Sequence, residues 1–194
     1  MEGKDAMPIS SRPDLRLTYE DFLLFPDDGK RHELIDGEHY VTASPNLRHQ
    51  KLLGRLHLAV AEYLRAHPGV GEVYFAPLDV IFSNWDIVEP DLLFVAADQR
   101  DILTEKNVVG APALVVEILS PSTRSRDRKL KHRLFEKSGV REYWMIDPDR
   151  DTVTVDRRGA EGGFTDRENF DAVGGVLTTT LFPGWSLALS TLFE

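Results

Sequence analysis

Two carboxylates stand in apolar surroundings, where a charged side chain needs a compensating partner. Asp91 follows a proline and heads the apolar run 92–95, and Glu117 lies inside the apolar segment Ala113–Leu119. A buried carboxylate without a partner costs several kcal/mol and tends to take up a proton. Two kinds of partner compensate such a group: an arginine or backbone group, or a metal ion that both carboxylates hold. The residue types alone leave both explanations open.

A lysine on the inward face of an expected helix adds to this pair. The segment Asp127–Ser138 is predicted to be a helix, and at about 100° per residue Lys131 falls on the same arc as Leu134. A lysine directed into a core needs a negative partner. The candidates are Asp127, one turn earlier on the same helix, and Glu117, on the strand that leads into it.

A histidine faces inward from an earlier helix. Apolar residues with helical spacing predict a helix from Asn46 to the residue before His67. His49 falls on the same arc as these apolar residues. A histidine in this position either forms a hydrogen bond in the core or belongs to a functional site, and both interpretations stay open.

The remaining pattern predicts a mixed α/β domain with one central sheet. Residues 1–15 are expected to be a loose tail, and residues 16–194 a single domain. A capping box at Thr18–Asp21 predicts a short helix that ends near Phe25, and Asp36-Gly37 predicts the turn of a hairpin within Glu33–Val41. Further strands are expected at Val73–Phe75, Leu78–Phe82, Ile87–Val95, Ala113–Leu119, Tyr143–Ile146 and Thr152–Val155, with one or two more within Val176–Phe193.

Composition excludes several classes of protein. The chain has 194 residues, 42% of them hydrophobic and 28% charged, which is typical of a globular chain. The absence of cysteine excludes disulfides, thiol nucleophiles and zinc sites with cysteine ligands. The N-terminus lacks the apolar core of a signal peptide, and no apolar stretch is long enough to span a bilayer. We therefore expect a cytoplasmic protein without a membrane segment.

Positive charge is concentrated in one segment of an otherwise acidic chain. The net charge is −9, whereas residues 124–133 carry six cations and one carboxylate. Such a strip beside the candidate site could guide a nucleic acid into it. The alternative is a solvated helix face. The candidate contacts are Arg124, Arg126, Arg128 and Lys129.

Four separated blocks together resemble the Uma-two family of the PD-(D/E)xK nuclease superfamily. In order, they are Glu89-Pro90-Asp91, the segment VEILSPST at 116–123, the pair Asp127 and Lys131, and Gly139–Pro148. The segment Glu33–Glu38 together with His49 resembles the N-terminal pattern of the same family. The similarity extends from about Thr18 to Phe193.

The resemblance implies a restriction-endonuclease-like core, a central mixed sheet flanked by helices, here with extra C-terminal strands. It implies that Asp91 and Glu117 bind Mg²⁺ or Mn²⁺ and that Lys131 is the catalytic lysine. The superfamily usually places this lysine two residues after the glutamate, where this chain has Leu119. Glu33 and His49 match family positions that are weaker catalytic candidates.

The function implied by the resemblance is a metal-dependent endonuclease that hydrolyses phosphodiester bonds, with double-stranded DNA as the expected partner. A homodimer is expected as well, because cutting both strands commonly uses two related sites. Two alternatives remain. One is a catalytically inactive nuclease-fold module that binds nucleic acid or protein, and the other is a structural or interaction protein whose buried charges form only an ion-pair network.

Overall fold

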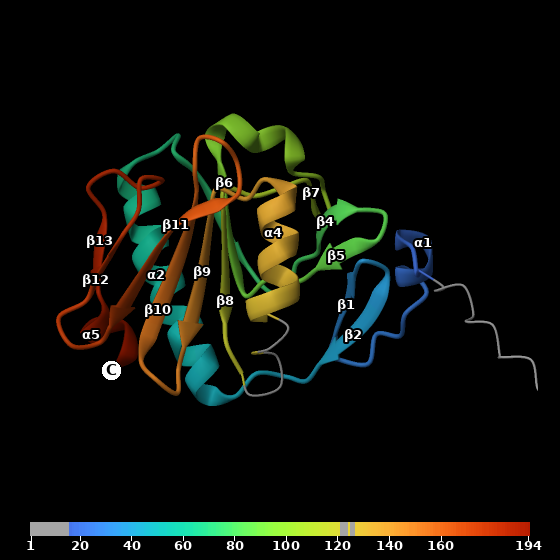
Figure 1. The fold of residues 1–194 in the computed structure, drawn as a ribbon, viewed down its shortest axis with the longest axis horizontal. Coiled ribbons are helices and arrows are strands. Elements are labelled where there is room, and N and C mark those ends of the chain that lie inside the picture. The colour runs from blue at the N-terminus through green and yellow to red at the C-terminus, as the bar shows by residue number, and fades with distance from the viewer. Residues whose placement is uncertain (1–15, 121–123, 125–126) are drawn as a thin grey trace, which may run out of the picture.

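A six-stranded mixed sheet forms the centre of the protein. The computed structural model describes residues 16–120, 124 and 127–194, so the expected tail at 1–15 lies outside the described residues. The strand order is β11-β10-β9-β8-β6-β3 (Figure 1), and only β8 and β9 are parallel neighbours in this sheet. The bounds are β3 Gly71–Phe75, β6 Leu92–Ala96, β8 Leu114–Ile118, β9 Glu142–Asp147, β10 Thr152–Arg158 and β11 Phe164–Asp171.

The first face of this sheet is covered by the long helix α2, Leu47–Ala66, which Asn46 caps through a side-chain bond to the His49 N–H. The helix starts and ends where the sequence predicts. Its apolar residues pack on strand residues such as Val116. Since side chains alternate along a strand, Glu117 points to the opposite face.

The opposite face is covered by a π-helical turn, η2 at Asp127–Lys131, that continues into α4 at His132–Ser138. Gly139, at φ 95°, ends this helix. The predicted helix is therefore confirmed, with a wider first turn. In Figure 1, α4 and α2 lie on opposite sides of the sheet. Phe135 of α4 belongs to a core shared by both of the larger sheets.

A second sheet, of five strands, stands beside the first. Its order is β2-β1-β5-β4-β7, and β1 and β2 form the predicted hairpin, with Ile35 paired to Glu38 across the turn. The expectation of one central sheet missed this second layer. The bounds are β1 Arg31–Ile35, β2 Glu38–Thr42, β4 Val80–Ser83, β5 Asp86–Val88 and β7 Val108–Val109.

The strand predicted over Ile87–Val95 is two strands in different sheets. β5 ends at Val88 in the second sheet, and β6 begins at Leu92 in the first. Pro90 has no N–H for a strand ladder, so the chain leaves one sheet here and enters the other. This crossing places Asp91 at the junction of the two sheets.

The chain ends differ from the prediction in detail. The capping box at Thr18 is confirmed, but its helix α1 spans only Tyr19–Phe22. The C-terminal region has the expected strands, β12 at Val176–Thr178 and β13 at Ser186–Ala188, and then a short helix α5, Leu189–Phe193, that was not predicted. A 3₁₀ helix η1, Ala97–Ile102, follows β6. No helix in the described ranges is long and apolar enough to cross a membrane.

The edge strand β3 depends on a glycine where it approaches β6. Gly71 has φ 154°, and a Cβ there would lie 2.3 Å from the Val95 carbonyl oxygen and 2.6 Å from the Phe94 ring. We predict that Gly71→Ala lowers the free energy of unfolding by about 2 kcal/mol, because either the backbone at Val95 or the Phe94 ring must move to make room for the Cβ.

Gly54 in α2 provides the matched control, since a Cβ there meets no atom within 4 Å. Gly54→Ala is expected to stabilise the protein by about 0.5–1 kcal/mol, as alanine is the better helix former. Urea denaturation of both variants measures the difference. Equal effects of the two substitutions would show that the close approach at Gly71 is not a constraint.

Candidate active site

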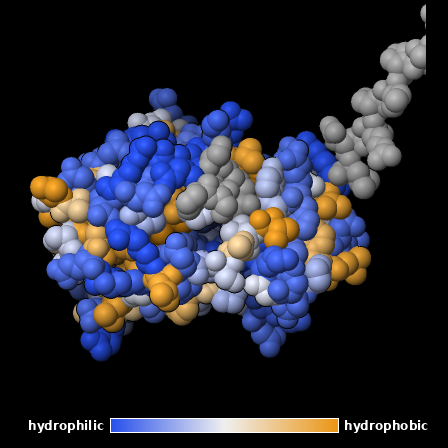
Figure 2. All heavy atoms as spheres, turned by 90° about the horizontal axis from the view of Figure 1, so that it is seen from below, coloured by the Kyte–Doolittle hydropathy of each residue, from blue (hydrophilic) through white to orange (hydrophobic). Residues whose placement is uncertain are grey.

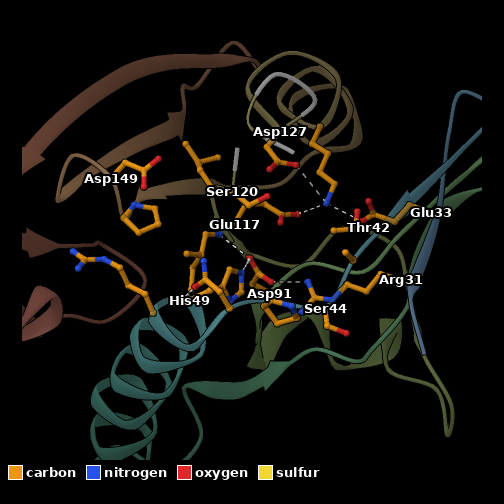
Figure 3. Close-up of a pocket in the computed structure, with 18 residues that line it drawn as sticks. Arg31, Glu33, Thr42, Ser44, His49, Asp91, Glu117, Ser120, Asp127 and Asp149 are labelled. Carbon is orange, nitrogen blue, oxygen red and sulfur yellow. Dashed lines mark hydrogen bonds and ion pairs between the residues drawn. The ribbon is translucent and has the colours of Figure 1, made fainter. Parts of the chain in front are cut away.

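A pocket of about 180 Å³ opens where the two sheets and the start of α2 meet. Figure 2 views this end of the molecule from below and shows a largely hydrophilic surface that is hollowed between two lobes. Figure 3 shows the polar side chains that converge on the pocket from β1, α2, the start of β6, β8 and η2. Its charged or titratable lining residues are Arg31, Glu33, Arg48, His49, Asp91, Glu117, Asp127, Lys131 and Asp149.

Asp91 is held by three donors. Oδ1 accepts from Arg31 Nη1 at 2.6 Å, and Oδ2 accepts from the Ile118 backbone N–H at 2.7 Å and from His49 Nε2 at 3.0 Å. Burial alone would raise the pKa of Asp91, but His49 and Arg31 together hold it below its ordinary value. Asp91 is therefore an ionised carboxylate with a fixed orientation.

Lys131 is buried, with 3% of its side chain exposed, and its ammonium is surrounded by carboxylates. Nζ lies 2.7 Å from Glu117 Oε1, 2.7 Å from Glu33 Oε1 and 3.8 Å from Asp127 Oδ1. Burial opposes its charge, but Glu117, Glu33 and Asp127 raise the pKa of Lys131 above its ordinary value. These carboxylates thus favour the charged form of Lys131, which donates hydrogen bonds and does not act as a base.

Glu117 has the opposite electrostatic character from Asp91. Burial raises the pKa of Glu117 well above its ordinary value; Asp127 and Asp91 raise it further, and Lys131 works against this. Burial therefore disfavours the charged form of this carboxylate, although the Lys131 ammonium lies 2.7 Å from its Oε1. Additional positive charge in the pocket would stabilise that form.

Glu33 comes from the second sheet. Its Oε1 accepts the backbone N–H of Glu89 at 3.1 Å as well as contacting Lys131. Glu89 in turn lies 3.0 Å from Arg31 Nε, and burial raises the pKa of Glu89 to about 7 although Arg31 opposes this. Strand β1 thus contacts two parts of the site: Glu33 contacts Lys131, and Arg31 contacts Asp91.

The five sequence-predicted residues Glu33, His49, Asp91, Glu117 and Lys131 all lie in this one pocket. Both candidate partners of Lys131 are present, and Glu33 adds a third.

Arg31 was missed. Its alternation with Glu33 on β1 would have placed it on the same face of that strand. His49 does form a hydrogen bond in the core, and the same bond places it in the site.

Arg124 and Arg128, which belong to the basic segment 124–133, contact carboxylates of the same chain. Arg124 donates to both oxygens of Asp147 at 3.0 Å and to Asp149 at 2.6 Å, and Arg128 contacts Asp147 at 3.3 Å. Lys129 is exposed, and Arg126 lies outside the described residues. The role of these cations in nucleic-acid contact stays a prediction.

The fold agrees with that of a solved structure. A crystal structure from Anabaena variabilis, described as "a putative nuclease belonging to DUF820", superposes with a TM-score of 0.77 over 91% of this chain and 97% of its own, at 20% identity. The architecture is therefore a restriction-endonuclease-like fold, as the sequence resemblance implied.

The sequence comparison gives the family. A family model described as "Putative restriction endonuclease" (Uma2) matches residues 19–190, and the chain belongs to this family. An uncharacterized protein of Synechocystis, slr1290, is 28% identical over 138 residues, which are 70% of each chain. Family and fold together indicate a nuclease.

The burial of Lys131 generates a stability prediction. Lys131→Met leaves the surrounding carboxylates without their cation, and we expect a loss of about 3–5 kcal/mol in the free energy of unfolding at pH 7.5. Without Lys131 the folded-state pKa of Glu117 rises further, so the folded state gains protons as the pH falls. The loss in the free energy of unfolding caused by Lys131→Met is therefore expected to be smaller at pH 5 than at pH 7.5.

Lys137→Met on the same helix is the control. Lys137 lies 3.1 Å from Asp86, but 56% of its side chain is exposed, so the expected loss is at most about 1 kcal/mol. Urea denaturation in EDTA at both pH values measures both variants. A loss of the same size at both pH values would contradict the electrostatic account of Lys131.

Proposed function

We propose that this protein is a divalent-metal-dependent endonuclease that hydrolyses phosphodiester bonds of double-stranded DNA. One observation carries the proposal: Asp91, Glu117 and the Lys131 ammonium, which the sequence resemblance singles out as a nuclease site, line a single pocket. Membership of a family of restriction endonucleases supports the same conclusion. The homodimer expected from the sequence belongs to this proposal, since cutting two strands commonly uses two sites.

The donor set fits a divalent cation of the magnesium type. The pocket lining carries five carboxylates against three side chains of arginine or lysine, and burial disfavours the charge of Glu117 although the Lys131 ammonium lies 2.7 Å away. Within the described ranges, no three aspartate, glutamate or histidine side chains are grouped as ligands of one ion. Mg²⁺ often binds through only one or two carboxylates and completes its shell with water and substrate phosphate. Asp91 and Glu117 are the two that would hold it.

The roles of the other residues follow from their contacts. Because its carboxylate neighbours favour its charged form, Lys131 would orient the attacking water or stabilise negative charge on the phosphate. Glu33 and Asp127 keep its ammonium beside Glu117, while Arg31 and His49 keep Asp91 in one orientation. A bound divalent cation supplies a water of lowered pKa and neutralises charge on the phosphate.

One observation favours the second candidate, a structural ion-pair network. Lys131 already has three carboxylate neighbours, as it would in a network that serves only the fold. The two functions differ in what they predict for Glu117. A purely structural network has no need of additional positive charge, whereas a nuclease site binds a metal ion there.

Plasmid cleavage tests the proposed activity. We expect the protein to nick supercoiled DNA in Mg²⁺ or Mn²⁺ and to lose this activity in EDTA. Lys131→Ala and Glu117→Gln are each expected to reduce the nicking rate by at least about 100-fold, because each removes a charge that acts on the transition state. Single-stranded DNA and RNA of the same sequence, tested in parallel, examine the preference for duplex DNA.

The control for cleavage is Lys106→Ala, which removes an exposed lysine outside the pocket lining. It is expected to cut at the wild-type rate. Equal cutting by wild type and Lys131→Ala would mean that Lys131 is not the catalytic lysine or that another nuclease contaminates the preparation. A wild type that leaves every substrate intact would contradict the proposed activity.

Metal binding gives a readout that does not depend on cleavage. Calorimetric titration with Mn²⁺ is expected to show binding that weakens at least about tenfold in Asp91→Asn and in Glu117→Gln, because each substitution removes a charged ligand. Asp101→Asn removes an exposed carboxylate outside the pocket and is expected to change nothing. Absence of binding in the wild type would favour the structural network.

A further inference from the structure

Two aspartates of the turn between β9 and β10 form ion pairs with arginines, one of which, Arg48, lines the pocket. Asp149 of this turn, residues 148–151, lines the pocket. Arg48 of α2 lies 2.5 Å from Asp151, and Arg124 lies 2.6 Å from Asp149. Arg48, which lines the pocket, is thus bound by a carboxylate of the same chain.

We propose that Arg48 binds a backbone phosphate of the substrate and that Asp151 occupies Arg48 as an internal competitor in the free protein. This inference rests on the proposed function, because it names a substrate contact of the same pocket. Nothing in the four sequence blocks that resemble a nuclease family includes Arg48 or Asp151.

The position of Arg48 fits a phosphate contact. It lines the pocket, it follows the cap residue Asn46 by two positions, and it precedes His49, which contacts Asp91. The first turn of α2 has no acidic residue, so the helix dipole adds to the positive potential. The Arg48 side chain is 52% exposed, so a bound duplex can reach it. A guanidinium forms paired hydrogen bonds with phosphate as readily as with carboxylate.

The pair between Arg48 and Asp151 is suited to exchange. Both side chains are about half exposed, at 52% and 43%, and such pairs contribute little to stability. Arg124 differs, because both oxygens of Asp147, a side chain that is 2% exposed, fix its guanidinium. We therefore expect the Arg48 pair to open when a phosphate arrives and the Arg124–Asp147 pair to persist.

A double-mutant cycle tests the exchange. Four full-length proteins are compared: wild type, Arg48→Ala, Asp151→Asn and the double variant. Their affinity for a fluorescently labelled 20-base-pair DNA duplex is measured by anisotropy in EDTA, so no cleavage occurs. Asp151→Asn is expected to bind about three- to tenfold more tightly than wild type, and Arg48→Ala about fivefold more weakly. In the Arg48→Ala background, the gain from Asp151→Asn is expected to fall below about twofold.

Salt dependence gives a second readout. Loss of one phosphate contact is expected to reduce the slope of log affinity against log salt by about one in Arg48→Ala. An equal gain from Asp151→Asn in both backgrounds would overturn the inference, because it would show a general effect of charge. An unchanged salt slope in Arg48→Ala would overturn it as well.

The same measurements separate this inference from the proposed function. Coupled effects on duplex binding would support the Arg48 contact. If plasmid also stayed intact in the cleavage assay, the proposed nuclease activity would be contradicted while the Arg48 contact stood. Failure of all four proteins to bind duplex, even at low salt, would overturn both. Cleavage without coupling between the two positions would leave the nuclease and remove only the role of Arg48.

Discussion

The structure depends on one buried ammonium. Lys131 holds Glu33, from the second sheet, and Glu117, from the first, within 2.7 Å of a single atom. These carboxylates would repel one another without it, and the desolvation cost of each is large. The lysine therefore joins α4 to both sheets at the point where the pocket forms. In the proposed nuclease, the same ammonium would also stabilise negative charge on a phosphate.

The crossing at Pro90 has a comparable influence on geometry. An uninterrupted strand over Ile87–Val95 would have placed Asp91 within one sheet, with neighbours only from that sheet. The break sends β5 and β6 into different sheets, and Asp91 then receives Arg31 from one side and the Ile118 N–H from the other. A residue without a backbone donor thus sets the position of a carboxylate one residue later.

Much of the site follows from sequence because it obeys local periodicity. Helical spacing places Lys131 and His49 on inward arcs, and apolar flanks identify Asp91 and Glu117. The second sheet could not be predicted from local periodicity, because β4, β5 and β7 are short and their pairing is decided by long-range contacts.

Strand β11 was not predicted from the sequence for a different reason. Most of its side chains are exposed and polar, so it lacks the alternation of apolar residues that indicates a strand. The partners of Arg124 could not be predicted from the sequence either, because Asp147 ends β9 and comes near Arg124 only when β9 pairs with β8.

The two sheets contribute to the pocket from distant parts of the chain, and this has a consequence for biosynthesis. Glu33 and Arg31 are made early, whereas Lys131 follows about a hundred residues later, and β8 needs β9 as its parallel neighbour. A ribosome-bound chain that stops before residue 131 has Glu33, Asp91 and Glu117 but lacks the ammonium that contacts two of them. The pocket residues are therefore complete only after most of the protein has been synthesised and has folded.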